Sequence, residues 1–111
     1  MDLEFLVNKL DLEVRCCKDN LKRDVLGGYV GDLLSDVMAN SKKGDVWVTR
    51  QIHQNIVAVA SLKEHAGIIL VQGASPEKAT LEKATKEGIP IMISKLSSFE
   101  TVGRIYQLIH T

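Results

Sequence analysis

Polar side chains gather in this sequence at the points where apolar, strand-like segments end. In an open α/β sheet, ligands collect beyond the carboxyl ends of the strands, where helix N-termini point backbone amides outward. Arg50 and Lys95 supply cations there, and Ser75 supplies a hydroxyl at a helix start. The sequence predicts a site for a small anionic metabolite or nucleotide, with helix caps and solvated turns as the alternative interpretation. Its candidate residues at the strand ends are Asp32, Thr49, Arg50, His53, Asn55, Gln72, Gly73, Ser75 and Lys95.

Gly27 and Gly28 join this candidate set, although they lie inside the strand-like run DVLGGYVGD. Three interpretations are open. Two adjacent glycines suit a tight hairpin turn with positive φ at both positions. They also suit a kinked strand, where the missing side chains let a neighbouring element approach closely. Finally, bare amides suit a seat for a phosphate or carboxylate. We favour the kinked strand.

No nucleotide-binding or catalytic signature accompanies these residues. GGYVG has the wrong spacing for G-x-G-x-x-G and lies within a strand rather than after one. GASPEKAT (73–80) lacks the second glycine of a Walker A loop and places Lys78 inside a helix. No serine or cysteine can be tied to His53 by spacing, so a catalytic triad is not expected. We therefore expect a binding protein and not an enzyme.

Helical and strand-like segments alternate along the chain. Apolar residues at helical spacing occupy 3–10, and alternating ones occupy 12–17. The run IILV (68–71) is apolar on both faces, which is typical of a central strand covered by helices on each side. This order predicts a single domain over 1–111, a three-layer α/β/α fold with a mainly parallel or mixed sheet of about five strands. The remaining expected strands are 24–32, 45–49 and 89–94, and the remaining expected helices are 33–44, 55–67, 76–87 and 97–109.

The composition limits the partners and cofactors. Fourteen basic residues balance fourteen acidic ones, so nothing favours nucleic acid or an anionic membrane. No apolar run reaches the roughly 20 residues of a membrane helix, and the acidic N-terminus differs from a secretory signal. Cys16 and Cys17 are adjacent, which disfavours a disulfide, and two thiols are too few for an iron–sulfur cluster or a structural zinc site. We expect a cytoplasmic protein without metal or cofactor.

The stretch KRDVLGGYVGDLLSDVMA, followed by GDVWVT, NIVAVASLKEHAGIIL and EGIPIMISKLSSFETVGRIY, resembles the DRTGG domain family over nearly the whole chain. Arg23 and Asp32 match its pattern, as do three glycines, whereas Lys22 replaces an aspartate and Leu26 a threonine. The resemblance implies a fold like the N-terminal domain of HPr kinase/phosphorylase. It also implies a regulatory or ligand-sensing module of the kind found beside CBS domains, with no established catalysis.

Two functions follow as expectations. The first is a non-catalytic regulatory module that binds a small anionic ligand at the strand ends. The alternative is an accessory or scaffold protein that acts through its surface, either as a homo-oligomer or on a larger enzyme. Because small stand-alone members of the family are often labelled hydrogenase-associated, the resemblance implies a hydrogenase or another redox complex as that enzyme. The thiol count excludes an iron–sulfur cluster in this chain itself.

Overall fold

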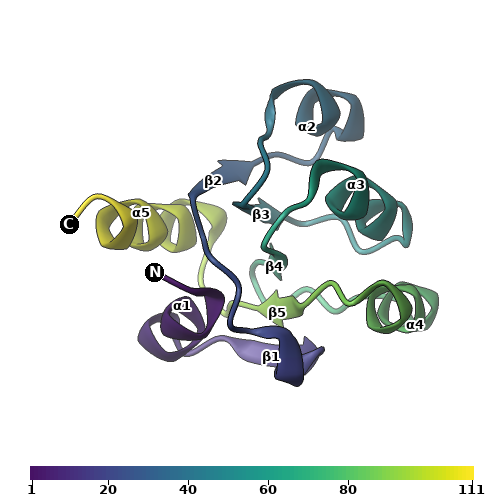
Figure 1. Cartoon of the computed structure of the whole chain (residues 1–111), viewed down its shortest axis with the longest axis horizontal. Helices are drawn as coiled ribbons and strands as arrows, with labels where there is room; N and C mark the ends of the chain where they lie inside the picture. The colour runs from purple at the N-terminus through teal and green to yellow at the C-terminus, as the bar shows by residue number, and fades with distance from the viewer.

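The computed structural model describes all 111 residues and contains one five-stranded sheet between two layers of helices (Figure 1). The strand order is β1-β5-β4-β3-β2, in which β1 runs antiparallel to β5 and all other neighbours are parallel. The predicted three-layer fold with a mixed sheet is therefore confirmed. The strands are β1 (Glu13–Cys16), β2 (Gly27–Val30), β3 (Asp45–Thr49), β4 (Gly67–Leu70) and β5 (Ile91–Ile93).

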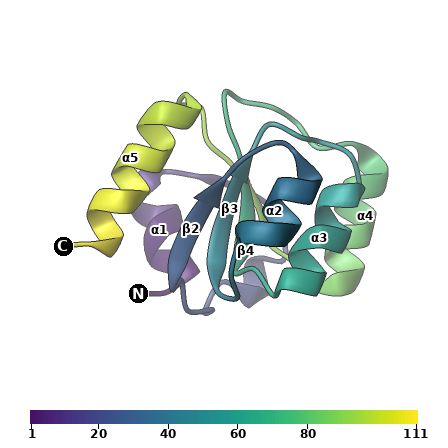
Figure 2. The same cartoon turned by 90° about the horizontal axis from the view of Figure 1, so that it is seen from above.

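The helices cover both faces of the sheet because the chain passes from one face to the other only once after β2. From β2 to β5 each connection moves one place along the sheet in the same direction, so right-handed crossovers put three helices on one face (Figure 2). The chain then passes to the other face, where the first and last helices lie. The helices are α1 (Leu3–Leu10), α2 (Leu34–Asn40), α3 (Asn55–Lys63), α4 (Lys78–Glu87) and α5 (Ser98–Ile109), with a 3-10 turn, η1, at Lys18–Asn20.

Each face of the sheet has its own apolar core. Leu3 and Leu6 of α1 and Ile105 of α5 pack with the β3–β5 side chains that point toward them. Trp47 and Ile68 point to the opposite face and pack with α2, α3 and α4. β4 contributes to both cores and lies between β3 and β5, as its unbroken apolar run predicted. None of the five helices is long and apolar enough to cross a lipid bilayer.

The first strand departs from the expected alternation. Leu12, Val14 and Cys16 were expected on one face, but the register shifts between Val14 and Cys16 where β1 pairs with β5. Leu12 and Val14 pack with the α1/α5 core, whereas Cys16 packs with the core on the other face. An extra residue in one strand turns every later side chain over, so the single-face prediction is wrong.

The glycine pair opens β2 rather than forming a turn. β2 pairs in parallel with β3 from Gly27↔Asp45 to Val30↔Val48, which excludes the hairpin. The pairing contains no register shift, so the strand is not bulged there. The close approach that the kinked-strand interpretation included is present, because a Cβ atom at Gly27 would lie 2.9 Å from Asp45 Oδ1. Gly27 thus leaves room for a carboxylate.

Candidate functional site

Asp32 joins the carboxyl ends of two neighbouring strands. Its Oδ1 accepts hydrogen bonds from the Thr49 hydroxyl and from the backbone amide of Arg50, both at 2.8 Å. The side chain of Gln51 donates to the Asp32 carbonyl at 3.0 Å. Asp32 does not cap the following helix, because α2 has Leu33 at its N-cap position and no side-chain cap. The Asp32 carboxylate therefore links the carboxyl ends of β2 and β3.

The other strand ends are also occupied by local contacts. His53 Nδ1 accepts from the backbone amide of Asn55 at 3.1 Å. The amides of Gln72 and Gly73 donate to the carbonyls of Leu96 and Ser94, which closes the space between the ends of β4 and β5. Arg50 and Lys95 are exposed and make no ion pair within 4.0 Å. Caps and turns account for most of these polar groups.

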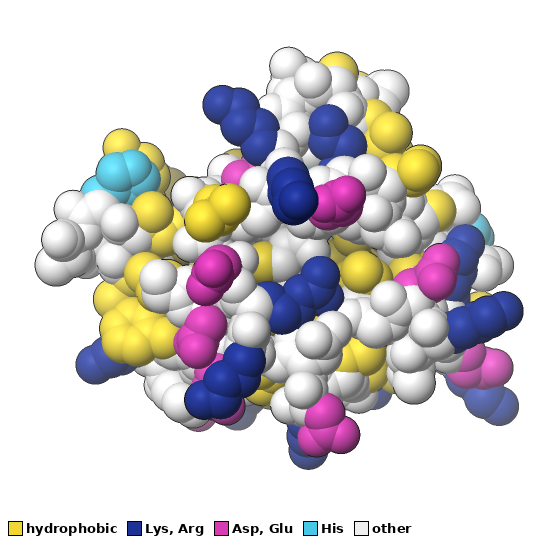
Figure 3. Space-filling view, viewed as in Figure 1, with side chains coloured by type: hydrophobic (Ala, Val, Ile, Leu, Met, Phe, Trp, Pro, Cys, Tyr) yellow, Lys and Arg dark blue, Asp and Glu magenta, His cyan; other side chains and the backbone are white.

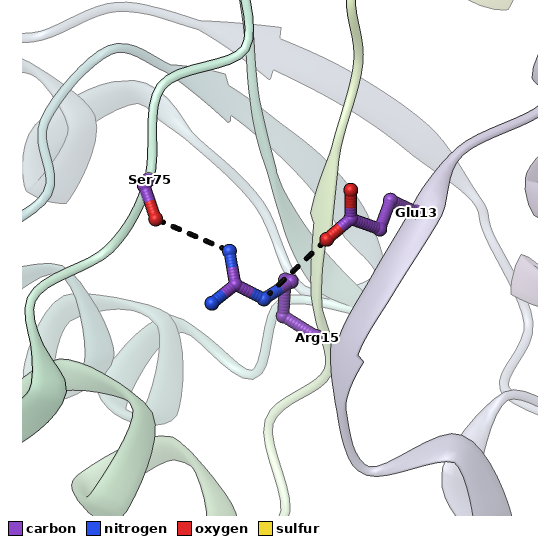
Figure 4. Close-up of polar contacts among 3 residues, drawn as sticks. All are labelled: Glu13, Arg15 and Ser75. Carbon is purple, nitrogen blue, oxygen red and sulfur yellow. Dashed lines mark hydrogen bonds and ion pairs between the residues drawn. The ribbon is translucent and has the colours of Figure 1, made fainter.

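Ser75 has a role that its position in the sequence did not indicate. It was expected to cap a helix starting at Pro76, but α4 begins at Lys78 with Glu77 at its N-cap. Instead, the Ser75 Oγ accepts a 3.2 Å hydrogen bond from Arg15 of β1, whose Nε lies 3.5 Å from Glu13 (Figure 4). The Ser75 hydroxyl therefore ties the loop before α4 to the edge strand.

The glycine pair lies at the opposite end of the sheet from the other nine candidate residues. Gly27 and Gly28 begin β2, whereas the other nine lie at or beyond the carboxyl ends of β2, β3, β4 and β5, which are parallel. The eleven residues thus fall into two groups separated by the length of a strand. Ligand binding by the strand-end group stays a prediction.

A cavity of about 470 Å³ lies beside the glycine pair. Its walls are the edge strand β2, the adjoining part of β3 and the helix α5, which stands beyond β2 in Figure 2. Apolar side chains reach the surface on the side of the molecule where α1 and α5 lie (Figure 3). The apolar lining is Leu26, Val30, Val46, Val48, Val102, Ile105 and Ile109, and the polar lining includes Asn40, Lys42, Asp45, Tyr106 and His110.

Asp45 is the acidic group of this cavity. Its side chain is largely buried, and its Oδ2 accepts a 2.8 Å hydrogen bond from the backbone amide of Lys42. Oδ1 faces Gly27 and has no hydrogen-bond partner within the chain. No cation lies within 4.0 Å of the carboxylate. Because side chains alternate along a strand, the Asp45 carboxylate points with Trp47 toward α2 and α3, whereas Val46 and Val48 point toward α5.

Two aromatic groups lie at the cavity wall. The rings of Tyr106 and His110 stack with centroids 4.0 Å apart and planes 21° apart. Tyr106 is 63% exposed. Tyr29 donates its hydroxyl to Asp36 Oδ2 at 2.5 Å, and this hydrogen bond, with burial, raises the pKa of Tyr29. The Tyr29 hydroxyl is thus already engaged by α2.

Sequence reasoning missed most of this cavity. Lys42 and Asp45 belong to the turn into β3, and the helical wall comes from residues 102–110 at the far end of the chain. The one local signal was Asp45 at the start of the apolar run DVWVT, next to a strand that begins with two glycines. Only the parallel register of β2 and β3 brings these features together.

A serine and a histidine meet in the interior without forming a catalytic pair. Ser41 donates its hydroxyl hydrogen to Val37 O at 2.6 Å, so His65 Nε2, at 2.8 Å, must donate to Ser41 Oγ. His65 Nδ1 is then an unprotonated nitrogen, and it is buried without a partner. The His65 ring also packs edge-on against Trp47, with the ring centroids 5.6 Å apart. Burial lowers the pKa of His65.

The buried His65 is expected to make stability depend on pH. Because its folded pKa lies below the unfolded value near 6.5, the unfolded chain binds a proton that the folded chain excludes. Stability should therefore fall as the pH drops below about 6.5, by up to ~1.4 kcal/mol per pH unit. Urea unfolding between pH 7.5 and 5.5 should show this slope in the parent and lose it in His65→Gln. His53→Gln, at an exposed position, is the matched control, and equal slopes in all three proteins would contradict the assignment.

Both cysteine side chains make structural contacts within the fold. Cys16 and Cys17 are unpaired, and their thiols donate to the carbonyls of Ile89 and Ala84, each at 3.5 Å. Burial, followed by the neighbouring Cys16, raises the pKa of Cys17 to about 11. Its thiol is therefore protonated near neutral pH, which disfavours a redox role.

Comparisons with known proteins identify a family and a similar fold. The family model of the DRTGG domain matches residues 5–108 of this chain. The fold is similar to that of the CBS and DRTGG domains in the regulatory region of a Clostridium perfringens pyrophosphatase, complexed with its activator diadenosine tetraphosphate. The TM-score is 0.67 at 18% sequence identity, and the match covers 96% of this chain and 45% of that chain. This chain thus spans less than half of that neighbour. No curated protein sequence matches it.

Proposed function

The chain belongs to the DRTGG domain family, and from this premise we propose that it is a non-catalytic regulatory module that senses a small molecule in the cavity between β2 and α5. The observation that carries the proposal is the cavity itself. Its volume of about 470 Å³ and its apolar lining with a few polar groups are typical of small-molecule sites. The regulatory region of the Clostridium perfringens pyrophosphatase has a similar fold and is complexed with its nucleotide activator, which supports a sensing role for this fold.

The position of the cavity supplies a way to transmit binding. One wall belongs to the sheet, and the other is formed by Ile105 and Ile109 of α5. A ligand that contacts both walls binds most tightly when the distance between α5 and the sheet matches the size of the ligand. Such differential affinity shifts the population of α5 positions, and this shift is what a regulatory module must produce.

A thermal-shift panel of nucleosides, nucleotides and phosphorylated metabolites tests the proposal. A ligand at a hundred times its dissociation constant stabilises the fold by about 2.7 kcal/mol. Gly28→Leu should abolish this shift, because its side chain would enter the space between Val46 and Ile105. Arg50→Ala, at the carboxyl end of β3, should keep it.

Each other outcome has a definite meaning. If Arg50→Ala loses the shift and Gly28→Leu keeps it, the ligand binds at the strand ends and the cavity assignment falls. If no compound in the panel moves the midpoint, ligand sensing by this module fails as a proposal.

An accessory role through the surface is the second candidate, and one observation favours it. A second, shallower apolar hollow adjoins the cavity and is lined by Val30, Phe99 and Tyr106, of which Phe99 is 88% exposed. Exposed apolar patches of this kind often mark protein contacts. Light scattering tests the self-associating form of this role: a strict monomer would contradict it, and an oligomer that Phe99→Ala dissociates would support it. A hydrogenase or another redox complex as the partner stays a prediction.

A further inference from the structure

The strand β2 forms one edge of the sheet and has a neighbour on one side only. We propose that this edge pairs antiparallel with β2 of a second copy of the chain, which joins two five-stranded sheets into one across a two-fold axis. The α5 helices of the two copies then lie side by side on one face of the joined sheet. This interface goes beyond ligand sensing and gives the self-associating accessory role a specific geometry.

The backbone groups of β2 that point away from β3 belong to Gly28 and Val30. Successive residues of a parallel strand direct their backbone groups alternately to one side and to the other. The amide of Gly31 donates to the carbonyl of Val48 in β3 at 3.1 Å, so Tyr29, two places earlier, also faces β3. No hydrogen bond outside that ladder involves Gly28 or Val30. Their N–H and C=O groups are therefore free at the edge.

The two edges of the sheet differ in their protection against pairing. Natural proteins block edge strands with charged side chains, prolines or bulges, because a free edge otherwise pairs with another chain. β1 has two of these features: Glu13 and Arg15 are charged, and its register shifts between Val14 and Cys16. β2 has no charged residue, no proline and no register shift. Figure 2 looks onto this unprotected edge, where β2 lies between α5 and α2.

The side of α5 next to this edge is apolar and uncovered. The shallow hollow beside β2 contains no charged side chain, and its lining includes Val30, Phe99, Gly103 and Tyr106. Phe99 and Tyr106 are 88% and 63% exposed. Gly103 lies inside α5, where glycine destabilises a helix, and an atom at its Cβ position would have no neighbour within 4 Å. No packing within a single copy requires this glycine, whereas a second helix approaching α5 would use the space.

A two-fold axis at Tyr29 matches the free backbone groups of the two β2 strands. Gly28 of each copy then lies opposite Val30 of the other, and each such pair exchanges two backbone hydrogen bonds. Both positions face α5, because Gly28 pairs with Val46 and Val30 with Val48 in the register with β3. Gly28 has no side chain, so it leaves room for the Val30 side chain across the axis.

The same axis also matches the two α5 helices. α5 runs antiparallel to β2, because Phe99 lies beside Val30 and Ile109 lies at the other end of the strand. The two-fold axis therefore brings Gly103 of both copies together and places Phe99 of each copy near Tyr106 of the other. An isologous contact requires such reciprocal pairs.

A second copy fits this surface better than an extended peptide does. A peptide would pair with β2 but would leave the apolar side of α5 exposed. A second copy supplies a strand edge and an apolar helix face in the same relative positions. Because β2 and the hollow contain no charged side chain, the surface meets itself without like-charge repulsion. Each copy has one such edge, so the assembly closes at two.

Sedimentation equilibrium on the full chain should show a dimer and no larger species. Val30→Pro is the decisive variant, because β3 does not use the Val30 amide and proline removes only the donor at the edge. The two-fold axis doubles this loss, so association should weaken by about 10–100-fold. Phe99→Glu should also dissociate the dimer, and it acts on association because Phe99 is exposed in a single copy. Leu62→Glu, at a 73% exposed position on α3, is the matched control and should stay dimeric.

Hydrogen exchange measured by NMR tests the strand pairing itself. The amides of Gly28 and Val30 should exchange at least about 10-fold more slowly in the dimer than at concentrations where the chain is monomeric. The amide of Gly31 bonds to Val48 within each copy and should be protected at both concentrations. A dimer in which the Gly28 and Val30 amides exchange freely would contradict the proposed interface.

The remaining outcomes are equally definite. A strict monomer at the concentrations used for NMR, or a dimer that Leu62→Glu dissociates, would overturn the inference. So would a folded Val30→Pro or Phe99→Glu variant that stays fully dimeric. If Val30→Pro does not fold, Phe99→Glu and the amide exchange decide. None of these measurements includes a ligand, so ligand sensing in the cavity is judged separately by the thermal-shift panel.

Discussion

Replacing Trp47 with alanine is expected to lower the free energy of unfolding by about 3–5 kcal/mol, the usual range for truncating a buried aromatic side chain. Trp47 is fully buried in the core shared by α2, α3 and α4. Its indole Nε1 also donates a 2.9 Å hydrogen bond to the Gly31 carbonyl. The substitution therefore creates a cavity and removes that carbonyl's partner. For a domain whose total stability is about 5–15 kcal/mol, this loss is a large fraction.

Urea unfolding followed by far-UV circular dichroism measures the loss, because the variant lacks the only tryptophan of the chain. Phe99→Ala is the matched control: it also truncates an aromatic side chain, but one that is exposed, so its change should stay within about 0.5 kcal/mol. A loss below 1 kcal/mol for Trp47→Ala would contradict the packing described here.

The sequence predicted the layers of this fold well because hydrophobic periodicity is a local signal. The helix at Leu3–Leu10 and the central strand β4 follow directly from the spacing of their apolar residues. The antiparallel pairing of β1 and its register shift do not, since both depend on β5, more than 70 residues later in the chain. The same limit explains Ser75, whose partner Arg15 lies 60 residues away.

The candidate site was harder to predict than the fold for the same physical reason. Polar residues after strands were visible, but hydrogen bonds within the chain occupy many of them, as Asp32 illustrates. The cavity requires β2, Asp45 and α5 to come together, and no short segment contains all three. Glycines in a strand did indicate a close approach correctly, although only the structure identifies the approaching group as Asp45.

Arg23, which matches the arginine of the family pattern, is expected to act on stability rather than on ligand binding. Its guanidinium donates to the Gly88 carbonyl at 2.9 Å and to the His65 carbonyl at 3.3 Å. These carbonyls follow the ends of α4 and α3, so one side chain joins both helix ends to the segment before β2. Hydrogen bonds from charged groups contribute about 1.5–3 kcal/mol each. Because Asn20 also donates to Gly88 O, we expect Arg23→Ala to cost about 2–3 kcal/mol in urea unfolding.

Arg23→Lys separates the geometry of the guanidinium from its charge. The ammonium group is a single point of donation and cannot span two carbonyls as the planar fork does, so about half of the loss should remain. Arg50→Ala removes an exposed arginine without such contacts and should change stability by less than about 0.5 kcal/mol. The ligand affinity of folded Arg23→Ala should equal that of the parent, because Arg23 does not line the cavity. A variant of parental stability but lost affinity would instead place this arginine in the binding site.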